Sequence, residues 1–398
     1  MRWNGEDLFK SVLLGSGSSG GGSGGGGSSG GASGVSPKEV NFWDYDGTCV
    51  HAYTVEEAQK LSALPDGPEH DGLVFQGWNW SLEGVKGLTR AMNIGAMYTT
   101  DDGTTRLHIT LQEGRTSPML GVGVNGTVTV DWGDGTEPDV LTGTKVSAIM
   151  RTPNHAYAKP GDYVIRLTVD GEMTFNGYNA DKQRSYILRH AYEADTRNVA
   201  YQAALKRVEI GSGISLINSN AFLHCYALES VTIPYGVETI GTYAFDECYA
   251  LKSVSIPDSV KNIYDNAFYN CYTLETLSLP AVVENIGTGV FAHCHILESG
   301  TLPNNVAVFG TGIFGFCYAI ASMYIPDSVT LVRTGMFNSC FGVAYYDFTS
   351  HTAVPTLEKT NAFTGIPADC EIRVPAALYD EWIAATNWST YSDYIKAY

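Results

Sequence analysis

The sequence has few basic residues, few charged residues overall and no long hydrophobic run. Lys and Arg number 24 against 42 Asp and Glu, which gives a formal net charge of −18, and only 17% of the residues are charged. A chain this acidic repels phosphate backbones, so we expect no nucleic-acid partner. No apolar run approaches the roughly 20 residues that a membrane helix needs, so we expect no membrane partner either.

The first residues lack the pattern of a secretory signal. "MRWNGEDLFKSVLLG" has one early Arg and then Glu6 and Asp7, and its longest apolar run is Val12-Leu13-Leu14. A signal peptide requires a basic start and a longer apolar core. The sequence also lacks a nucleophile–base pair, a phosphate-binding glycine loop and a metal-ligand cluster. We therefore expect no enzymatic activity, no metal and no cofactor.

What is present begins with a tether. Residues 15–34 contain only Gly, Ser and one Ala, a composition typical of a flexible linker with a span of roughly 25 Å. Residues 1–14 are too short to fold alone, and Asn4 is placed to cap a short helix. We interpret this peptide as an anchor for docking to a larger assembly; a disordered terminus or an expression tag is the alternative. The anchor candidates are Trp3, Leu8, Phe9, Val12 and Leu13.

Residues 35–102 predict a small β module. "VNFWDYDGTCVHAYTV" reads as two strands joined at Asp46-Gly47, "EEAQKL" as a short helix, and "LPDGPEHDGLVFQGWNW" as turns and a further strand. The module resembles the internalin-type B repeat, which is β-grasp-like. The residues that carry this resemblance are Val40, Phe42, Gly47, Pro65, Pro68, Gly72, Phe75, Gly77 and Trp78.

The same stretch contains a D-x-D-G-T string, which resembles the signature of the haloacid-dehalogenase phosphatases. The resemblance implies that Asp44 is a nucleophile and Asp46 a general acid. That fold needs the string at the end of a buried parallel strand, which reads as a near-continuous apolar run. Asn41 interrupts the run, and the short helix is too brief for a parallel crossover. The phosphatase is therefore a minor alternative, and the string is interpreted as a turn.

Residues 103–176 alternate apolar and polar at period two, with Gly-Asp-Gly and Pro-Gly turns between the strands. This segment is similar to a polycystic-kidney-disease (PKD) domain, an immunoglobulin-like β-sandwich. Its hallmarks here are Trp132-Gly133-Asp134-Gly135-Thr136, His155, Tyr157, Pro160, Gly161 and Tyr163. Asp131 and Asp134 raise the alternative of a metal site, but Asp side chains that cap a turn are the favoured interpretation. His155 is interpreted as a core hydrogen-bonding residue.

After a connector at residues 177–204, the chain repeats with a period of 23 up to residue 369. The pattern L-x-x-V-x-I-P-x-x-V-x-x-I-x-x-x-A-F-x-x-C predicts a solenoid and resembles the BspA-like leucine-rich repeats. Residues 370–398 resemble the helical cap that shields the apolar face of a last rung. The fold expected from the whole chain is thus mainly β and multidomain: a β-grasp-like module, a β-sandwich, and a capped leucine-rich-repeat solenoid.

The repeat places cysteines and phenylalanines in two internal columns. Rungs roughly 5 Å apart hold side chains parallel, whereas the Cβ atoms of a disulfide lie about 3.8 Å apart. We therefore expect reduced, buried thiols, and a straight column does not make a tetrahedral zinc site. Cys49 and Cys370 are also expected to be free. The columns are Cys225, Cys248, Cys271, Cys294, Cys317 and Cys340, and Phe222, Phe245, Phe268, Phe291, Phe314 and Phe337.

An aromatic stripe follows the cysteine column directly. Stacked, partly exposed rings suit the apolar face of a sugar polymer; the alternative is a self-stacking ladder that only stabilises the repeats. Beside the stripe, the fifth position of each rung is predicted to face outward and to offer hydroxyls. The ligand candidates are Tyr226, Tyr249, Tyr272, His295, Tyr318 and Phe341 in the stripe, and Thr232, Ser255, Ser278, Thr301 and Tyr324 in the hydroxyl row.

This combination of modules resembles adhesive proteins of gut bacteria and of their phages. The first hypothesis is a phage virion protein, a fibre or capsid decoration at the virion surface, held to a capsid or tail protein by residues 1–14 and binding host-surface or mucus glycans or proteins. The alternative is a leucine-rich-repeat adhesin of the bacterial cell surface. Self-association into a homo-oligomer stays open, although no heptad run predicts a coiled coil.

Overall fold

The computed structural model describes most of the chain beyond the Gly/Ser tract. Two compact units, Met1–Asp101 and Asp102–Tyr398, are treated separately. None of the helices within the described ranges has the length and apolar character to cross a membrane. The described residues are 35–44, 48–70, 73–78, 80, 82–88, 91–100, 102–175, 187–189, 201–298, 300, 302–304, 306 and 308–398.

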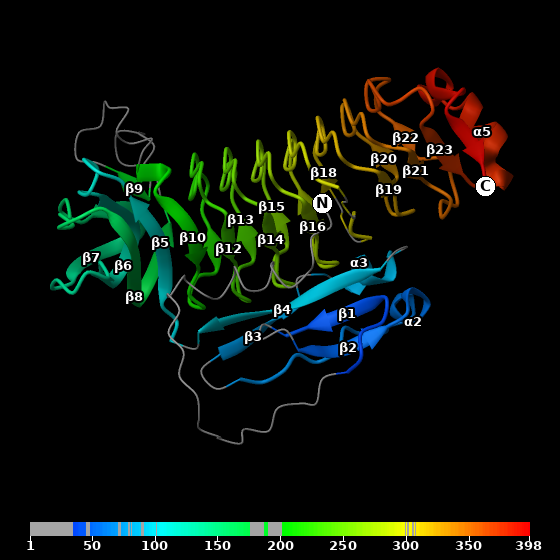
Figure 1. Cartoon of the computed structure of the whole chain (residues 1–398). Helices are drawn as coiled ribbons and strands as arrows, with labels where there is room; N and C mark the ends of the chain where they lie inside the picture. Colours follow the sequence, from blue (N-terminus) through cyan, green and yellow to red (C-terminus); the bar gives the residue numbers. More distant parts are fainter. Residues whose placement is uncertain are drawn as a thin grey trace. The chain divides into compact units, whose positions relative to one another are not determined.

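The first unit is a four-stranded sheet in the order β2-β1-β4-β3 (Figure 1). The central strands β1 and β4 are parallel, and the two outer pairs are antiparallel. This order agrees with the β-grasp-like prediction, and the hairpin and short helix are confirmed, although residues 45–47 of the turn lie outside the described residues. The elements are β1 (Val40–Trp43), β2 (Cys49–Tyr53), α2 (Val55–Gln59), β3 (Leu73–Trp78), α3 (Leu82–Lys86) and β4 (Met92–Thr100).

The helix α2 starts where the sequence supplies a capping box. The Thr54 hydroxyl accepts a hydrogen bond from the Glu57 N–H at 3.2 Å, and the Glu57 carboxylate accepts one from the Thr54 N–H at 2.8 Å. These two bonds satisfy N–H groups that have no partner inside the helix. Ala58 then faces the core of this unit, which also contains Phe42 and Trp78.

The second unit begins with an antiparallel sheet in the order β5-β8-β6-β7, with β9 paired to β6. Strict alternation buries Leu107, Ile109 and Leu111 on one face of β5. Trp132 is fully buried, and its Nε1–H donates to Asp139 at 2.8 Å. The strands are β5 (Thr105–Leu111), β6 (Met119–Asp131), β7 (Asp139–Arg151), β8 (Gly161–Phe175) and β9 (Leu188–Arg189).

This sheet does not end at the module boundary. Strand β10 (Leu205–Glu209), the first strand of the repeats, pairs antiparallel with β5, so that Val208 lies opposite Leu107. The module and the first rungs therefore share one nine-stranded sheet and one hydrophobic core, and Phe175 contacts Phe222 with ring centroids 5.1 Å apart. Most of the connector at 177–204 lies outside the described residues.

The repeats form a solenoid with the predicted 23-residue register. Parallel pairing places Val231 beside Val254 and Val254 beside Leu277, each 23 residues further on. The first column of strands is β12 (Ser230–Thr232), β14 (Ser253–Ser255), β16 (Thr276–Ser278), β19 (Ser322–Tyr324), β21 (Tyr345–Asp347) and β23 (Glu371–Val374). The second is β11 (Leu216–Ile217), β13 (Thr239–Ile240), β15 (Asn262–Ile263), β17 (Asn285–Ile286), β18 (Val308–Phe309), β20 (Leu331–Val332) and β22 (Thr356–Leu357).

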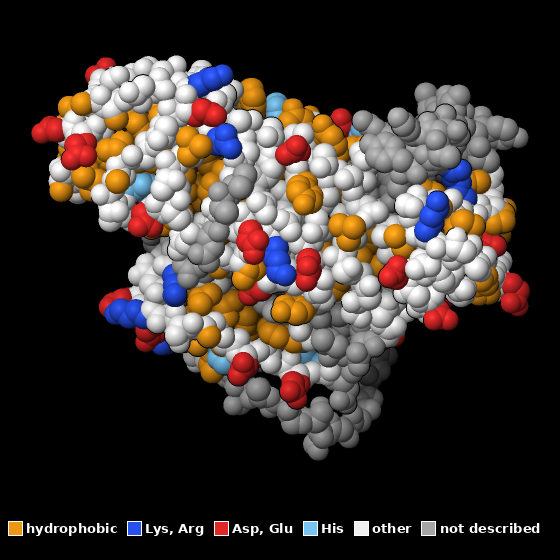
Figure 2. Space-filling model, turned by 180° about the vertical axis from the view of Figure 1, so that it is seen from behind, with side chains coloured by type: hydrophobic (Ala, Val, Ile, Leu, Met, Phe, Trp, Pro, Cys, Tyr) orange, Lys and Arg blue, Asp and Glu red, His pale blue; other side chains and the backbone are white. Residues whose placement is uncertain are grey.

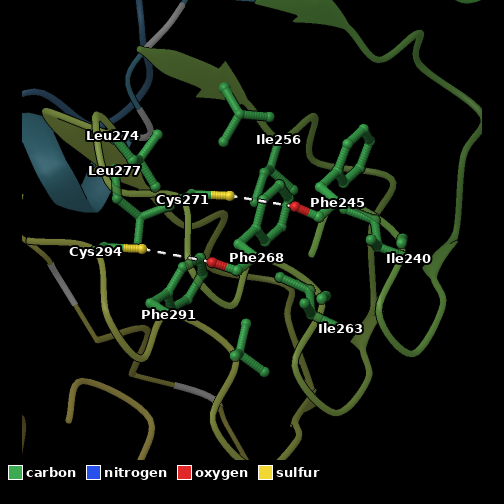
Figure 3. Packing of buried hydrophobic residues seen from close by; sticks show 14 of the residues in the cluster. Ile240, Phe245, Ile256, Ile263, Phe268, Cys271, Leu274, Leu277, Phe291 and Cys294 are labelled. Carbon is green, nitrogen blue, oxygen red and sulfur yellow. Dashed lines mark hydrogen bonds between the residues drawn. The ribbon is translucent and has the colours of Figure 1, made fainter. Parts of the chain in front are cut away.

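The two predicted internal columns are confirmed. Phe245 and Phe268 stack at 5.1 Å, and Phe268 and Phe291 at 5.6 Å, all fully buried. The eight cysteines are free and buried. In Figure 3 the Cys271 and Cys294 thiols donate to carbonyl oxygens of Phe245 and Phe268 in the preceding rung, at 3.3 and 3.5 Å. Burial raises the pKa of these thiols, which keeps them protonated and able to donate.

The C-terminal cap is confirmed as a short helical segment that closes the last rung. Trp382 and Trp388 are fully buried and pack at 5.1 and 5.6 Å, respectively, against Phe348, which follows β21. Without this cover the last rung would expose its apolar face to water. The elements are η1 (Ala376–Leu378), α5 (Tyr379–Ala384), η2 (Trp388–Tyr391) and β24 (Ile395–Ala397), which pairs with β23.

A buried histidine packed against the cap should make stability fall in acid. His351 is 4% exposed beside Phe348 and Trp382, its Nε2 lies 3.3 Å from the Val329 carbonyl oxygen, and burial lowers its pKa below the usual 6.5. The unfolded chain takes up a proton near pH 6.5 and the folded chain only at lower pH, so the stability is complete above pH 6.5 and is lost as the pH falls through the folded-state pKa.

We expect the unfolding temperature of the wild type to drop more than that of His351→Gln between about pH 7.5 and about pH 5. Glutamine keeps a donor for the Val329 carbonyl but does not titrate. Calorimetry of both proteins at the two pH values measures the difference, and the comparison subtracts the effect of the other histidines. Equal drops in the two proteins would contradict the assignment.

Candidate functional site

The aromatic stripe is a continuous stack along the solenoid. Successive ring centroids from Tyr226 to Phe341 lie 5.0, 4.7, 4.5, 4.6 and 5.4 Å apart, with interplanar angles of 28° or less. Each ring sits in the turn that follows the buried cysteine of its rung and precedes the next strand. The structure thus brings the six stripe residues together as the sequence predicted.

Stacking changes what the stripe can offer to a ligand. The ring faces of Tyr249, Tyr272 and His295 are covered by the neighbouring rings, so these residues present ring edges rather than faces to solvent. A sugar ring packs against an aromatic face. In the interior of the stripe the geometry is therefore that of the self-stacking ladder, the structural alternative.

The end of the stripe is different. Phe341 is 56% exposed and Tyr318 37% exposed, whereas the four earlier members are half-buried. The Ser339 N–H donates to the Thr364 carbonyl of the next rung at 2.7 Å, which aligns the seventh rung with the sixth. In this alignment Pro367 occupies the position that follows Phe341 in the stripe. Among the described residues, no aromatic ring stacks on the second face of Phe341. At the irregular seventh rung the stack therefore ends, and the Phe341 ring is more than half exposed.

Electrostatics keep the stripe uncharged near neutral pH. Burial lowers the pKa of His295, so its imidazole is neutral. Burial raises the pKa of Tyr249, and a hydrogen bond with Glu247 raises it further. On the face shown in Figure 2, Lys and Arg side chains occur in small groups among acidic and hydrophobic ones.

The predicted hydroxyl row is only partly described. Thr232 on β12 and Ser255 on β14 are half-exposed, and Tyr324 on β19 is exposed with its hydroxyl donating to Ser350 at 3.1 Å. Ser278 lies on β16, but its side chain is outside the described residues, as is Thr301 altogether. The sequence interpretation missed a second half-exposed or exposed row two residues earlier, formed by Ser230, Ser253 and Thr276.

A charged cluster at the joint of β5 and β10 was also missed. Glu209 accepts hydrogen bonds from Arg207 at 2.6 Å and from His108 at 3.1 Å. Burial alone would raise the pKa of Glu209, but the His108 hydrogen bond and the Arg207 charge outweigh burial and lower it. No sequence signal could find this cluster, because it depends on pairing between strands about one hundred residues apart.

Asp44 is a buried residue with structural partners for its carboxylate and its N–H. It is 3% exposed at the end of β1, its carboxylate lies 2.8 Å from His70 Nε2, and its N–H donates to the Thr48 carbonyl. The expectation that this segment is too short for a parallel crossover was wrong, because β4 pairs with β1 in parallel after a connection that includes two strands, β2 and β3, and two helices. Asp46 lies outside the described residues.

The Asp-rich turn of the second unit is held by its own side chains, as predicted. Asp131 accepts from the Gly133 N–H at 2.8 Å, and Asp134 accepts from the Thr136 N–H at 3.1 Å. His155 stacks on Trp132 at 4.5 Å with Nε2 2.8 Å from Asp134. Within the described ranges, no three His, Cys, Asp or Glu side chains are placed to hold a metal ion. The anchor candidates Trp3, Leu8, Phe9, Val12 and Leu13 lie outside those ranges.

Comparison with known sequences identifies the repeats. Residues 215–344 match the BspA type leucine rich repeat region in six copies. A comparison with curated proteins gives no match. The described rungs and this match together establish a leucine-rich-repeat solenoid within a mainly β chain.

Solved structures give partial likenesses. A leucine-rich-repeat protein of T. pallidum is 28% identical over 40% of this chain and 78% of its own, with a TM-score of 0.36. One from Bacteroides ovatus is 29% identical over 44% of this chain and 47% of its own, with a TM-score of 0.39. A leucine rich cell surface protein of Faecalibacterium prausnitzii is 21% identical over 52% of this chain and 88% of its own, with a TM-score of 0.24.

Proposed function

We propose that this chain is a non-enzymatic, adhesin-like binding protein of the bacterial cell surface, which contacts host-surface or mucus glycans or proteins through its solenoid. The BspA type repeats at 215–344 support this reading, because the combination of modules in this chain resembles that of adhesive surface proteins. The buried cysteines and the hydrogen-bonded Asp44, Asp131 and Asp134 have structural partners, which favours binding over catalysis.

The observation that carries the proposal is the open ring at the end of the stripe. A phenylalanine that is more than half exposed contributes little to core packing, since most of its surface stays in water. Tyr318 stacks behind it at 5.4 Å and 10°, which holds the Phe341 ring in one orientation. A fixed, exposed aromatic face is the feature that sugar rings and apolar side chains of a partner recognise.

Phe341→Ala should weaken binding of the full chain to immobilised mucin at least about tenfold without changing the unfolding temperature. The matched control is Tyr235→Ala, since Tyr235 is 64% exposed and lies outside the stripe. Surface plasmon resonance gives the affinities and calorimetry the stability. Unchanged binding by Phe341→Ala, or equal losses in both variants, would contradict the role of this ring.

A virion protein is the second candidate function, and one sequence feature favours it. The Gly/Ser tract at 15–34 separates residues 1–14 from everything else, as a tether on a docking peptide would. Residues 1–34 fused to a fluorescent protein would then co-sediment saturably with virions that lack this chain. Co-sedimentation would move the protein from the bacterial surface to a capsid or tail, and its absence would favour the cell-surface reading.

A further inference from the structure

Two corners of each of the first six rungs place the backbone in the left-handed region. At both corners φ lies between 55° and 65°. At eleven of these twelve positions the N–H donates a hydrogen bond to a carbonyl oxygen of the next rung. The first corner is occupied by Asn220, Tyr243, Asn266, Gly289, Gly312 and Gly335. The second is occupied by His224, Glu247, Asn270, His293, Phe316 and Ser339.

Both corners have the same left-handed backbone conformation, but different types of residue occupy them. Glycine adopts this conformation without a steric cost, and side chains such as those of His, Glu and Phe do not. The first corner uses glycine in three of six rungs, whereas the second uses it in none. Backbone geometry therefore does not explain the side chains of the second corner, and strained positions that keep large side chains are typical of functional surfaces.

The second corner lies directly beside the aromatic stripe, two residues earlier in each rung. The His224 ring is 5.7 Å from that of Tyr226, and the His293 ring is 5.9 Å from that of His295. All six corner side chains are half-buried, so part of each faces solvent. We call the stripe and the second corner together the double row.

The double row combines hydrogen-bonding groups with ring edges at a regular interval. Imidazole, carboxylate and amide groups of His224, Glu247, Asn270 and His293 alternate donors and acceptors. Stripe centroids recur every 4.5 to 5.4 Å, so a matching ligand must present hydroxyls at a similar repeat along its length. A net charge of −18 and the Glu247 carboxylate repel polyanions.

We propose that the double row binds an extended, uncharged β-linked glycan that lies along the solenoid, with a sugar ring packed on Phe341 at its end. This inference rests on the proposed function and names its ligand class. The structural alternative is that the corner side chains serve only to stabilise the stack. Contacts between rungs support it: His224 Nε2 lies 3.5 Å from Glu247 Oε2, and the ring centroids of His293 and Phe316 lie 4.4 Å apart.

Glycine substitution separates these explanations, because glycine fits the corner backbone. We expect Glu247→Gly and His293→Gly in the full chain to lower the affinity for cellohexaose or chitohexaose at least about tenfold, with unfolding temperature unchanged or raised. Tyr243→Gly at the first corner is the matched control and should keep wild-type affinity. Titration calorimetry gives the affinities, and alginate, a polyanionic glycan, should bind no variant.

Each outcome decides one question. A lower unfolding temperature with unchanged affinity would show that the corner side chains only stabilise the rungs and would overturn the inference. Wild-type protein that binds mucin through Phe341 but neither oligosaccharide would overturn the ligand class while the proposed function stands. Wild-type protein that binds neither mucin nor oligosaccharide would overturn both.

Discussion

Replacing Phe268 by alanine is expected to lower the free energy of unfolding by about 3–5 kcal/mol. The ring is fully buried and stacks between Phe245 at 5.1 Å and Phe291 at 5.6 Å. Alanine removes the ring and leaves a cavity that the neighbouring rungs cannot fill, because the ladder of inter-rung hydrogen bonds fixes their spacing. Urea denaturation followed by tyrosine and tryptophan fluorescence measures the loss.

The control is Tyr264→Ala in the same rung. Tyr264 is exposed, so its removal should change the unfolding free energy by no more than about 0.5 kcal/mol. Because neighbouring rungs support one another, the Phe268→Ala transition should also broaden as the array loses cooperativity. A loss of unfolding free energy for Phe268→Ala as small as that for Tyr264→Ala would show that the phenylalanine column does not stabilise the core.

The repeat core could be predicted because the same pattern of buried residues recurs in six successive repeats. The cysteine and phenylalanine columns recur at an exact interval of 23, and a parallel stack converts that interval into vertical neighbours. The left-handed corners could not be predicted in this way. His224, Glu247 and Asn270 share no chemical character, and only the inter-rung hydrogen bonds of their N–H groups reveal the common conformation.

The candidate site was predictable in position but not in exposure. Tyr272 and Phe341 occupy the same place in the repeat, yet only Phe341 ends the stack. Its exposure depends on the seventh rung, where Gly365 and Pro367 stand in place of a corner side chain and an aromatic ring. Because that rung departs from the repeat pattern, its consequences appear only in three dimensions.

Pairing between distant strands was equally hidden from the sequence. Strand β5 has the alternation of a strand with one buried face, and this pattern does not specify whether its edge meets β8 alone or β10 as well. The same holds for β1, whose parallel partner β4 begins some fifty residues later. Local patterns specify which face of a strand is buried, whereas edge pairing is decided by the assembled core.

The joint between β5 and β10 gives the second large effect. Val208→Asp should lower the free energy of unfolding by at least about 3 kcal/mol, because Val208 is fully buried opposite Leu107 and a carboxylate there has no partner. Lys206→Asp is the matched control: Lys206 lies on the same strand, is half-exposed, and changes to the same residue.

Hydrogen exchange then tests whether the module and the repeats form one cooperative structure. A shared sheet and a shared core predict that Val208→Asp weakens amide protection in β5 and β12 together, since both strands pair directly with β10. Loss confined to β12, with β5 keeping its protection, would mean two independently stable domains. Loss of protection in both strands would mean that the antiparallel sheet caps the N-terminal end of the solenoid, as the C-terminal cap with Trp382 and Trp388 closes the other end. A solenoid capped at both ends holds the open face of Phe341 on a surface that cannot fray from either side.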